Sequence, residues 1–185
     1  LTEFYYNAPS PLSATPFGGL RLIDGVWTDV DFVASSAFEA HIAPAGDKMF
    51  FVLEDGSGRG VGHVSIKADG EWGTPEALPA TINSDNYFPM YFNSTMDGSL
   101  YWTQLSFGAF IVRTPFVDGT YSAPERVRMS LSYTGSCAHP YIAPDESYLI
   151  FDCERGGKND LYVCFRTENG GWTQAQKIEE VSDPD

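Results

Sequence analysis

Glu39, His41 and His139 are side chains whose chemistry would let them act together as acid, base or metal ligands. Imidazole and carboxylate groups suit zinc or manganese. However, His139 lies far along the chain from the other two residues, so their spacing carries no local metal-binding motif. Metal binding here stays open as an alternative to a plainer role, in which the histidines hydrogen-bond neighbouring backbone. We predict no resident metal or cofactor.

The carboxylates also raise the question of sugar hydrolysis, which needs two carboxyl groups roughly 5–10 Å apart across the sugar ring. Asp31 and Asp85 lie in polar stretches typical of solvated loops, which leaves Glu39 without a partner carboxylate. The Gly-Ser-Gly-Arg-Gly run at 56–60 indicates an exposed hairpin loop and lacks the frame of a nucleophile elbow. We therefore favour a protein that is not an enzyme. A carbohydrate-active hydrolase or lyase that uses Glu39 is the alternative.

The three cysteines, Cys137, Cys153 and Cys164, lack the close paired spacing of a zinc site. They fit two interpretations. Either all three are small buried hydrophobic residues within strands, or Cys153 and Cys164 form one disulfide between neighbouring strands of a hairpin. The cysteines therefore do not determine the redox compartment.

Composition restricts the classes of partner. The 185-residue chain has 11 basic and 25 acidic residues, a net charge of −14. That charge repels phosphate backbones and anionic lipid surfaces, which argues against nucleic acid as a partner. Apolar runs such as residues 48–53 are far shorter than the roughly 20 residues of a membrane helix, so we expect no membrane insertion. Length and composition predict a single domain over residues 1–185.

The elements that must position these residues emerge from internal repeats. A turn dipeptide, a spacer and a large aromatic residue recur four times, roughly 50 residues apart, at 24–27, 69–72, 118–121 and 169–172. Asp-Gly and Asn-Gly favour tight hairpins because the central residues of such turns take positive φ. Each repeat should therefore contain a hairpin whose second strand begins at the aromatic residue. We expect these aromatics to pack between repeats; they are Trp27, Trp72, Tyr121 and Trp172.

A second pattern supplies the remaining strands. Residues 40–51 align without gaps with residues 140–151, and residues 89–102 form a looser copy. Each copy indicates a short strand, a turn and a strand of bulky apolar residues, while helical periodicity is absent. Four antiparallel strands repeated every 40–50 residues are typical of a β-propeller. The predicted fold is therefore all-β, a β-propeller of four-stranded antiparallel blades with about four blades in this chain.

The repeat core resembles a known family. Residues 140–151, Pro-Tyr-Ile-Ala-Pro-Asp-Glu-Ser-Tyr-Leu-Ile-Phe, are similar to the P-x-I-S-P-D-G-K-x-L-x-F core of the WD40-like PD40 repeats of TolB-type propellers. Glu146 departs from the pattern, which has Gly there, and Ala45 stands where the family usually has Asp. The resemblance implies a non-catalytic binding or scaffold module and a bacterial periplasmic or extracellular location. The matching repeats cover about 39–79, 87–127 and 138–178, with a partial repeat at about 1–33.

The predicted site lies at the mouth of the propeller channel. The first strand of each blade is innermost, and the alignment sets Phe88 level with Glu39 and His139. Converging polar groups at a channel mouth are the usual binding-site hypothesis, and aromatic rings beside them suit sugar faces. We therefore predict that a protein or glycan ligand binds one rim of the channel, through Glu39, His41, Phe88, His139 and Tyr141.

The strand count also makes a prediction about ring closure. Residues 2–7 align with the second strand of a blade and residues 18–33 with its third and fourth strands, so the first blade should lack an inner strand. We expect four stacked blades from a ring of five or six, with open apolar flanks that tend to recruit another chain or to aggregate. A four-bladed ring, closed by the C-terminus beside residues 4–6, would contradict this expectation.

Overall fold

The computed structural model describes residues 3–7, 17–30, 37–131 and 135–181. These residues form β-strands and one 3-10 turn, η1 (Glu179–Val181). None of them belongs to a helix long and apolar enough to cross a membrane. The predicted all-β fold is confirmed.

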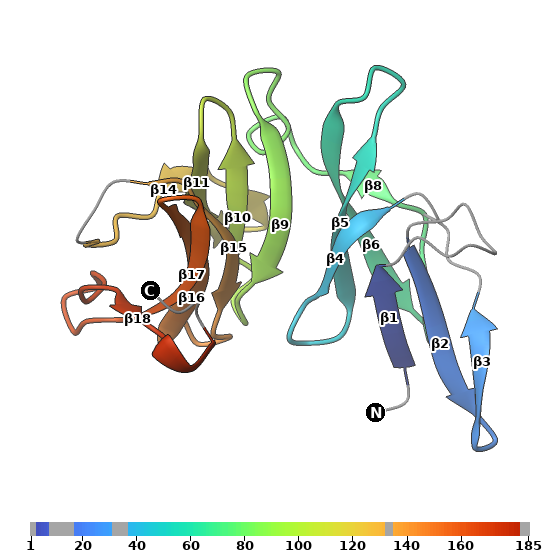
Figure 1. Ribbon diagram of the computed structural model, residues 1–185. Coiled ribbons are helices and arrows are strands. Elements are labelled where there is room, and N and C mark those ends of the chain that lie inside the picture. Colours follow the sequence, from blue (N-terminus) through green and yellow to red (C-terminus); the bar gives the residue numbers. More distant parts are fainter. Residues whose placement is uncertain (1–2, 8–16, 31–36, 132–134, 182–185) are drawn as a thin grey trace.

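Four larger antiparallel sheets follow one another along the chain (Figure 1). The first sheet, blade 1, has the strand order β1-β2-β3, and the fourth sheet, blade 4, has the order β15-β16-β17-β18. Blade 1 comprises β1 (Glu3–Asn7), β2 (Phe17–Ile23) and β3 (Val26–Val30), and blade 4 comprises β15 (Cys137–Ile142), β16 (Tyr148–Arg155), β17 (Lys158–Phe165) and β18 (Gln176–Lys177).

Two further sheets lie between them. Blade 2 begins with β4, β5 and β6, and both β7 and β8 pair with β6; blade 3 has the order β9-β10-β11-β14, with the hairpin β12-β13 set apart. The strands of blade 2 are β4 (Phe38–Ile42), β5 (Lys48–Glu54), β6 (Gly60–Ala68), β7 (Glu71–Trp72) and β8 (Glu76–Ala77). Those of blade 3 are β9 (Phe88–Ser94), β10 (Leu100–Leu105), β11 (Ala109–Thr114), β12 (Phe116–Val117), β13 (Thr120–Tyr121) and β14 (Glu125–Arg126).

Within the described residues, blade 1 lacks the inner strand that the other three blades have. Among the described residues, β1 pairs with β2 alone, and Trp27 pairs with Leu22 as Trp72 pairs with Lys67. The strand β1 therefore stands in the second position of a blade, as the repeats predict. Blades 1 and 4 lie at opposite ends of an arc (Figure 1), so the described residues do not form a closed four-bladed ring.

The core consists of apolar layers between neighbouring sheets. Met49 and Phe51 are buried between blades 1 and 2, against Tyr5 and Trp72. A larger layer containing Trp102 separates blades 2 and 3, and another that contains Tyr101 separates blades 3 and 4. Each sheet therefore contributes to the burial of its neighbour, which is how propeller blades are stabilised.

Three of the four predicted hairpin turns have the expected backbone. In the turns at 24–25, 69–70 and 118–119, both the Asp and the Gly have positive φ. The fourth turn differs, because only Gly170 is at positive φ. There the backbone N–H of Thr167 bonds the carbonyl of Gly171, which leaves a three-residue loop in place of a two-residue one. Asn169 instead accepts a hydrogen bond from the Thr167 hydroxyl at 2.5 Å.

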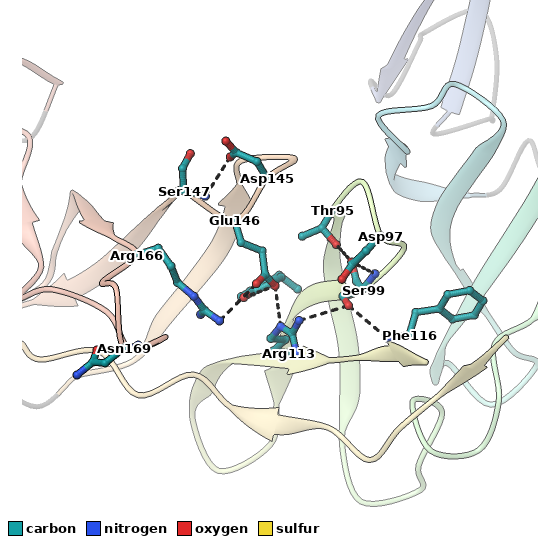
Figure 2. Close-up of polar contacts among 12 residues, drawn as sticks. Thr95, Asp97, Ser99, Arg113, Phe116, Asp145, Glu146, Ser147, Arg166 and Asn169 are labelled. Carbon is teal, nitrogen blue, oxygen red and sulfur yellow. Dashed lines mark hydrogen bonds and ion pairs between the residues drawn. The ribbon is translucent and has the colours of Figure 1, made fainter. Parts of the chain in front are cut away.

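A charged clamp joins blades 3 and 4 (Figure 2). One carboxylate oxygen of Glu146 accepts hydrogen bonds from Arg113 Nε at 2.7 Å and from the Tyr101 hydroxyl at 2.9 Å, and Arg166 lies 3.4 Å from the other oxygen. Glu146 has a φ of 58°, whereas the matching turns of blades 2 and 3 have Gly46 and Gly98. A non-glycine residue at positive φ costs free energy, and here it places a carboxylate between two cations.

The cysteines pair differently from the predicted alternative. Cys137 and Cys153 are opposite each other on β15 and β16, with Cα atoms 4.1 Å apart, and form a disulfide. Cys164 lies opposite Leu149 while Cys153 lies opposite Asp160, so the predicted Cys153–Cys164 bond is wrong. Cys164 is a buried free thiol whose pKa burial raises to about 12. The interpretation of all three cysteines as small buried hydrophobic residues therefore fits Cys164 and is wrong for Cys137 and Cys153.

Candidate functional site

A β-bulge interrupts each of the three described inner strands. The register shifts within β4, β9 and β15, and one non-glycine residue beside each shift has positive φ: Glu39 (59°), Tyr91 (54°) and His139 (50°). Bulges often re-aim side chains next to functional sites, and positive φ is costly for residues of this size. The same strained position, repeated in three blades, presents an acid, a phenol and an imidazole.

Tyr91 occupies the position that the sequence alignment gave to Phe88. The turn after β9 closes from Thr95 to Ser99, one residue shorter than the turn from Ala43 to Lys48 in blade 2. The sequence alignment matched Pro89 with Ala40 and Pro140. Because Pro89 precedes both the bulge and the shorter turn, that alignment of blade 3 was shifted by three residues. His41 in blade 2 and Tyr141 in blade 4 occupy the same position of the inner strand. Blade 3 has Asn93 at that position.

Phe88 lies between blades 2 and 3 and outside the site. A Cβ atom built on Gly60 would come within 2.1 Å of the Phe88 ring, so the ring occupies the space that this glycine leaves free. Phe88 also packs against the core layer that contains Phe50 and Trp102.

The three bulges line one open pocket of about 310 Å³. It brings together Glu39, His41 and His139 from the predicted site. Tyr141 follows the lining residue Pro140 on β15 but does not itself line the pocket. Its side chain is 49% exposed and stacks on Tyr148. The remaining lining residues are Ala40, Tyr91, Phe92, Asn93 and Pro140.

Glu39 is the partly buried acid of the pocket. Burial raises the pKa of its carboxyl group, and hydrogen bonds from the backbone and side chain of Tyr91 oppose that rise. The Tyr91 backbone N–H donates to Glu39 Oε2 at 3.0 Å. The pKa of Tyr91 rises to about 12, because its hydroxyl is partly buried and lies near the negative charges of Glu39 and Asp152.

His139 is exposed and held from two sides. Its Nδ1 lies 2.6 Å from Asp152 Oδ1, and its ring centroid is 3.9 Å from that of Tyr91. Its backbone N–H donates to Thr103 Oγ1 at 3.1 Å. A carboxylate on Nδ1 favours a proton on that nitrogen, which leaves Nε2 as the atom available to a ligand.

His41 is positioned by contacts with blade 3. Its Nε2 lies 3.0 Å from both the backbone nitrogen and the hydroxyl of Ser94, and its Nδ1 lies 3.2 Å from the Asn93 amide nitrogen. Burial lowers the pKa of His41 to about 4, so this imidazole is neutral at pH 7. Its nitrogens are occupied by protein groups, which corresponds to the plainer of the two roles considered for it.

The geometry does not assemble a metal centre from these side chains. Among the described residues, no group of three or more His, Cys, Asp and Glu side chains is arranged to hold a metal ion. Within the pocket, Glu39 bonds Tyr91, His139 bonds Asp152, and His41 bonds Ser94. The arrangement suits recognition of a ligand by hydrogen bonds and ring stacking.

Sequence reasoning missed Tyr91, Asn93 and Asp152. The signal for the first two was available in the turns, because Thr95 matches Ala43 and Ala143 as the residue that closes each one. Counting back from those residues leads to Asn93 and, across the bulge, to Tyr91. Asp152 carried no such signal, since its contact with His139 depends on the register between β15 and β16.

Comparison with known proteins adds information about the fold. No protein-family model matches the chain, and no curated protein matches its sequence. Among solved structures, TolB from Acinetobacter baumannii is similar with a TM-score of 0.61 at 15% identity, over 91% of this chain and 39% of that one. A putative TolB from Agrobacterium tumefaciens has a TM-score of 0.47 at 15% identity, over 96% of this chain and 80% of that one. The chain therefore spans well under two thirds of the A. baumannii protein. At this identity, the likeness shows a TolB-like β-propeller fold and nothing further.

Proposed function

We propose that this protein is a non-catalytic binding module that holds a partner protein at the mouth of its channel. The observation that carries the proposal is the pocket in which three successive inner strands present Glu39, Tyr91 and His139 from strained bulges. Backbone strain of this kind persists where the surrounding structure enforces it, often at ligand-binding positions. Its repetition in three blades supports a shared role.

The pocket chemistry favours a basic or hydrogen-bond-donating group on the partner. Glu39 and Asp152 contribute carboxylates around the Tyr91 ring, in a chain of net charge −14. A lysine or arginine side chain would meet both the negative charge and an aromatic face. We therefore propose a partner segment that carries such a residue.

The disulfide supports a location outside the reducing cytosol. Disulfides persist in oxidising compartments such as the periplasm and the extracellular space, and Cys137–Cys153 joins two strands of blade 4. The proposed location is therefore periplasmic or extracellular, as the family resemblance implies.

Site-specific photo-crosslinking in the native host tests this function. A photoreactive residue at position 141, beside the pocket, should capture one protein, and Tyr91→Ala should abolish that capture. The same probe at Val117, which is 52% exposed in blade 3, is the control and should capture nothing comparable. Equal capture at both positions, or capture that survives Tyr91→Ala, would contradict the proposal.

The two alternatives have their own tests. Binding on a glycan array that disappears in Tyr91→Ala would replace the protein partner with a sugar. Hydrolysis of aryl glycosides that disappears in Glu39→Gln would replace the binding module with an enzyme.

A further inference from the structure

Blades 2 and 3 carry an equivalent backbone N–H group at their outer edges. Leu78 directly follows β8 and Val127 directly follows β14 (Figure 1), and their N–H groups donate to the carbonyls of Gly62 and Ile111 at 2.9 Å. Gly62 and Ile111 are therefore matching positions. The N–H and the carbonyl of one strand residue point to the same side of an antiparallel strand, so both N–H groups point toward the outer edge.

In blade 2, a side-chain amide satisfies this N–H group. The Gly62 N–H donates to Asn83 Oδ1 at 2.8 Å. In return, Asn83 Nδ2 donates to the carbonyl of Gly62 at 2.9 Å and to that of Leu78 at 2.7 Å. The partner that fits this position is thus a planar side-chain group with an oxygen acceptor.

In blade 3, the corresponding N–H group has no such partner. Beyond Val127 the chain runs toward blade 4, and the Ser130 carbonyl accepts the N–H of Ala175 at 2.9 Å. Within the described ranges, no residue accepts a hydrogen bond from the Ile111 N–H. Ile111 lines a pocket of about 670 Å³ that is formed by residues of blade 3 and of the segment leading into blade 4. The donor is therefore available to a ligand in this pocket.

Two arginines give the pocket a positive charge. Arg126 and Arg128 line it, are exposed, and form no ion pair with any residue that the structure describes. The Arg126 guanidinium lies over the Phe110 ring, 3.9 Å from its centroid. Stacking holds this planar group while its N–H edge can still bind a carboxylate through two hydrogen bonds. In a chain of net charge −14, two neighbouring cations without acidic partners favour an anionic ligand.

The remaining wall of the pocket is mainly apolar. Met129 and Leu131 line it and pack against the core layer that contains Tyr101. A ligand that fits this wall combines a carboxylate with apolar neighbours, as an acidic residue within an apolar peptide segment does. The use of Asn83 at the matching place in blade 2 also argues for a polypeptide side chain, since aspartate has the same shape as asparagine.

We propose that this pocket binds an acidic side chain from an apolar segment of a partner protein. The carboxylate accepts the Ile111 N–H and pairs with Arg126 and Arg128, while its apolar neighbours pack on Met129. The described lining residues of this pocket include none of those at the channel mouth, so the proposal does not depend on the function proposed there.

Backbone-amide NMR of the chain during titration with acetyl-Leu-Asp-Leu-amide tests the site. The Ile111 amide proton should move downfield as the carboxylate accepts its hydrogen bond. The Gly62 amide, which already bonds Asn83, is the internal control and should not move. The matched peptide acetyl-Leu-Asn-Leu-amide lacks the charge and should bind at least about tenfold more weakly.

A double variant tests the arginines. Arg126→Gln together with Arg128→Gln should weaken binding of the aspartyl peptide by at least about tenfold, to the level of the asparaginyl peptide. Arg155→Gln together with Lys158→Gln removes the same charge from exposed positions of the β16–β17 hairpin and should bind as the wild type does. Unchanged amide positions in β5 and β10 show that each double variant is folded.

Four results would overturn the proposal, and three of them need no variant. The Ile111 amide could stay in place throughout the titration, or the two peptides could bind equally well. An equal shift of this amide in sodium sulfate at the same ionic strength would assign the pocket to small anions and not to an acidic peptide. Binding of the aspartyl peptide that survives loss of both Arg126 and Arg128 would be the fourth.

Discussion

At the scale of single residues, His41 gives the candidate site a pH dependence. Its pKa is lowered by burial from 6.5 to about 4, so the unfolded chain binds a proton more readily than the folded one between these values. The stability contributed by the neutral imidazole is therefore complete above about pH 6.5 and declines as the pH falls toward 4. A shift of this size corresponds to about 3 kcal/mol.

Urea unfolding of wild type and His41→Gln at several pH values measures this effect. We expect the free energy of unfolding of the wild type to fall more steeply than that of the variant between about pH 6.5 and 4. Carboxylates such as Asp97, whose pKa is lowered, also lose stabilisation in acid, but they do so equally in both proteins. Parallel curves for the two proteins would show that His41 is not held neutral.

Glu146 tests the value of the clamp between blades 3 and 4. Glu146→Gln keeps the shape of the side chain but removes the charge that Arg113 and Arg166 share. We expect the free energy of unfolding to fall by about 2 kcal/mol, since charge-assisted bonds in a partly buried site exceed ordinary surface pairs. The exposed Glu168→Gln is the matched control and should change stability by less than about 0.5 kcal/mol. Equal losses of stability in Glu146→Gln and Glu168→Gln would show that Glu146 makes no more than a surface ion pair.

The sequence predicted residue types in the site better than residue partners. Glu39, His41 and His139 could be placed together because their blades align without gaps. Phe88 was assigned to the same site because the alignment of blade 3 started from Pro89 and not from the turn residue Thr95, which gives the correct register. The role of Glu146 was equally hidden, since a departure from a glycine pattern does not reveal which cations lie across the interface.

At the scale of elements, hairpin turns depend on glycine at positive φ. Gly170 has a φ of +80°, and Gly170→Val should lower the free energy of unfolding by about 1–2 kcal/mol because a β-branched residue resists that conformation. Gly56→Val is the control, since Gly56 lacks a positive φ and a Cβ there would meet nothing within 4 Å. Equal melting temperatures for the two variants would contradict the strained turn.

The disulfide is a second element-scale feature with a clear test. Replacing both Cys137 and Cys153 by serine should lower the free energy of unfolding by about 3 kcal/mol, because the bond closes a loop of sequence separation 16. Thiol labelling of the denatured, unreduced wild-type chain should find one reactive thiol, that of Cys164. Three reactive thiols would show that the chain is reduced.

Sequence reasoning was strongest for the elements. Turn dipeptides and alternating apolar runs determined most strands because they record local backbone preference and burial. The Asn169-Gly170 loop is one residue longer than the other three turns, because the Thr167 N–H bonds the Gly171 carbonyl. The pairing of Cys137 with Cys153 could not be read from spacing, since it depends on which strand lies beside β16.

At the scale of the whole molecule, repetition made the propeller predictable. A sheet that is apolar on both faces requires a neighbour on each side, and the repeat period identified four such sheets in order. Repetition alone did not say what covers the two outer faces, because every blade carries the same kind of signal. Trp27 in blade 1 is 44% exposed, unlike Trp72 and Trp172 at the matching positions, and so marks one of these outer faces.

Stacked blades should also lose stability one interface at a time. Trp72→Ala removes the hydrogen bond to Tyr5 and leaves a cavity beside Met49 and Phe51, so blade 1 should detach more readily. We expect amide protection in β1–β3 to fall by about 3 kcal/mol while protection in β16 and β17 is kept.

Trp172→Ala should lower amide protection in β16 and β17 and leave protection in β1–β3 unchanged, because the Trp172 ring packs on Tyr101 between blades 3 and 4. Native-state hydrogen exchange measured by mass spectrometry compares the two variants blade by blade. Nearest-neighbour coupling, as in other repeat proteins, predicts two separate patterns of lost protection. A uniform loss across all four blades in both variants would instead show that the arc unfolds as one cooperative unit, with the interfaces coupled over its whole length.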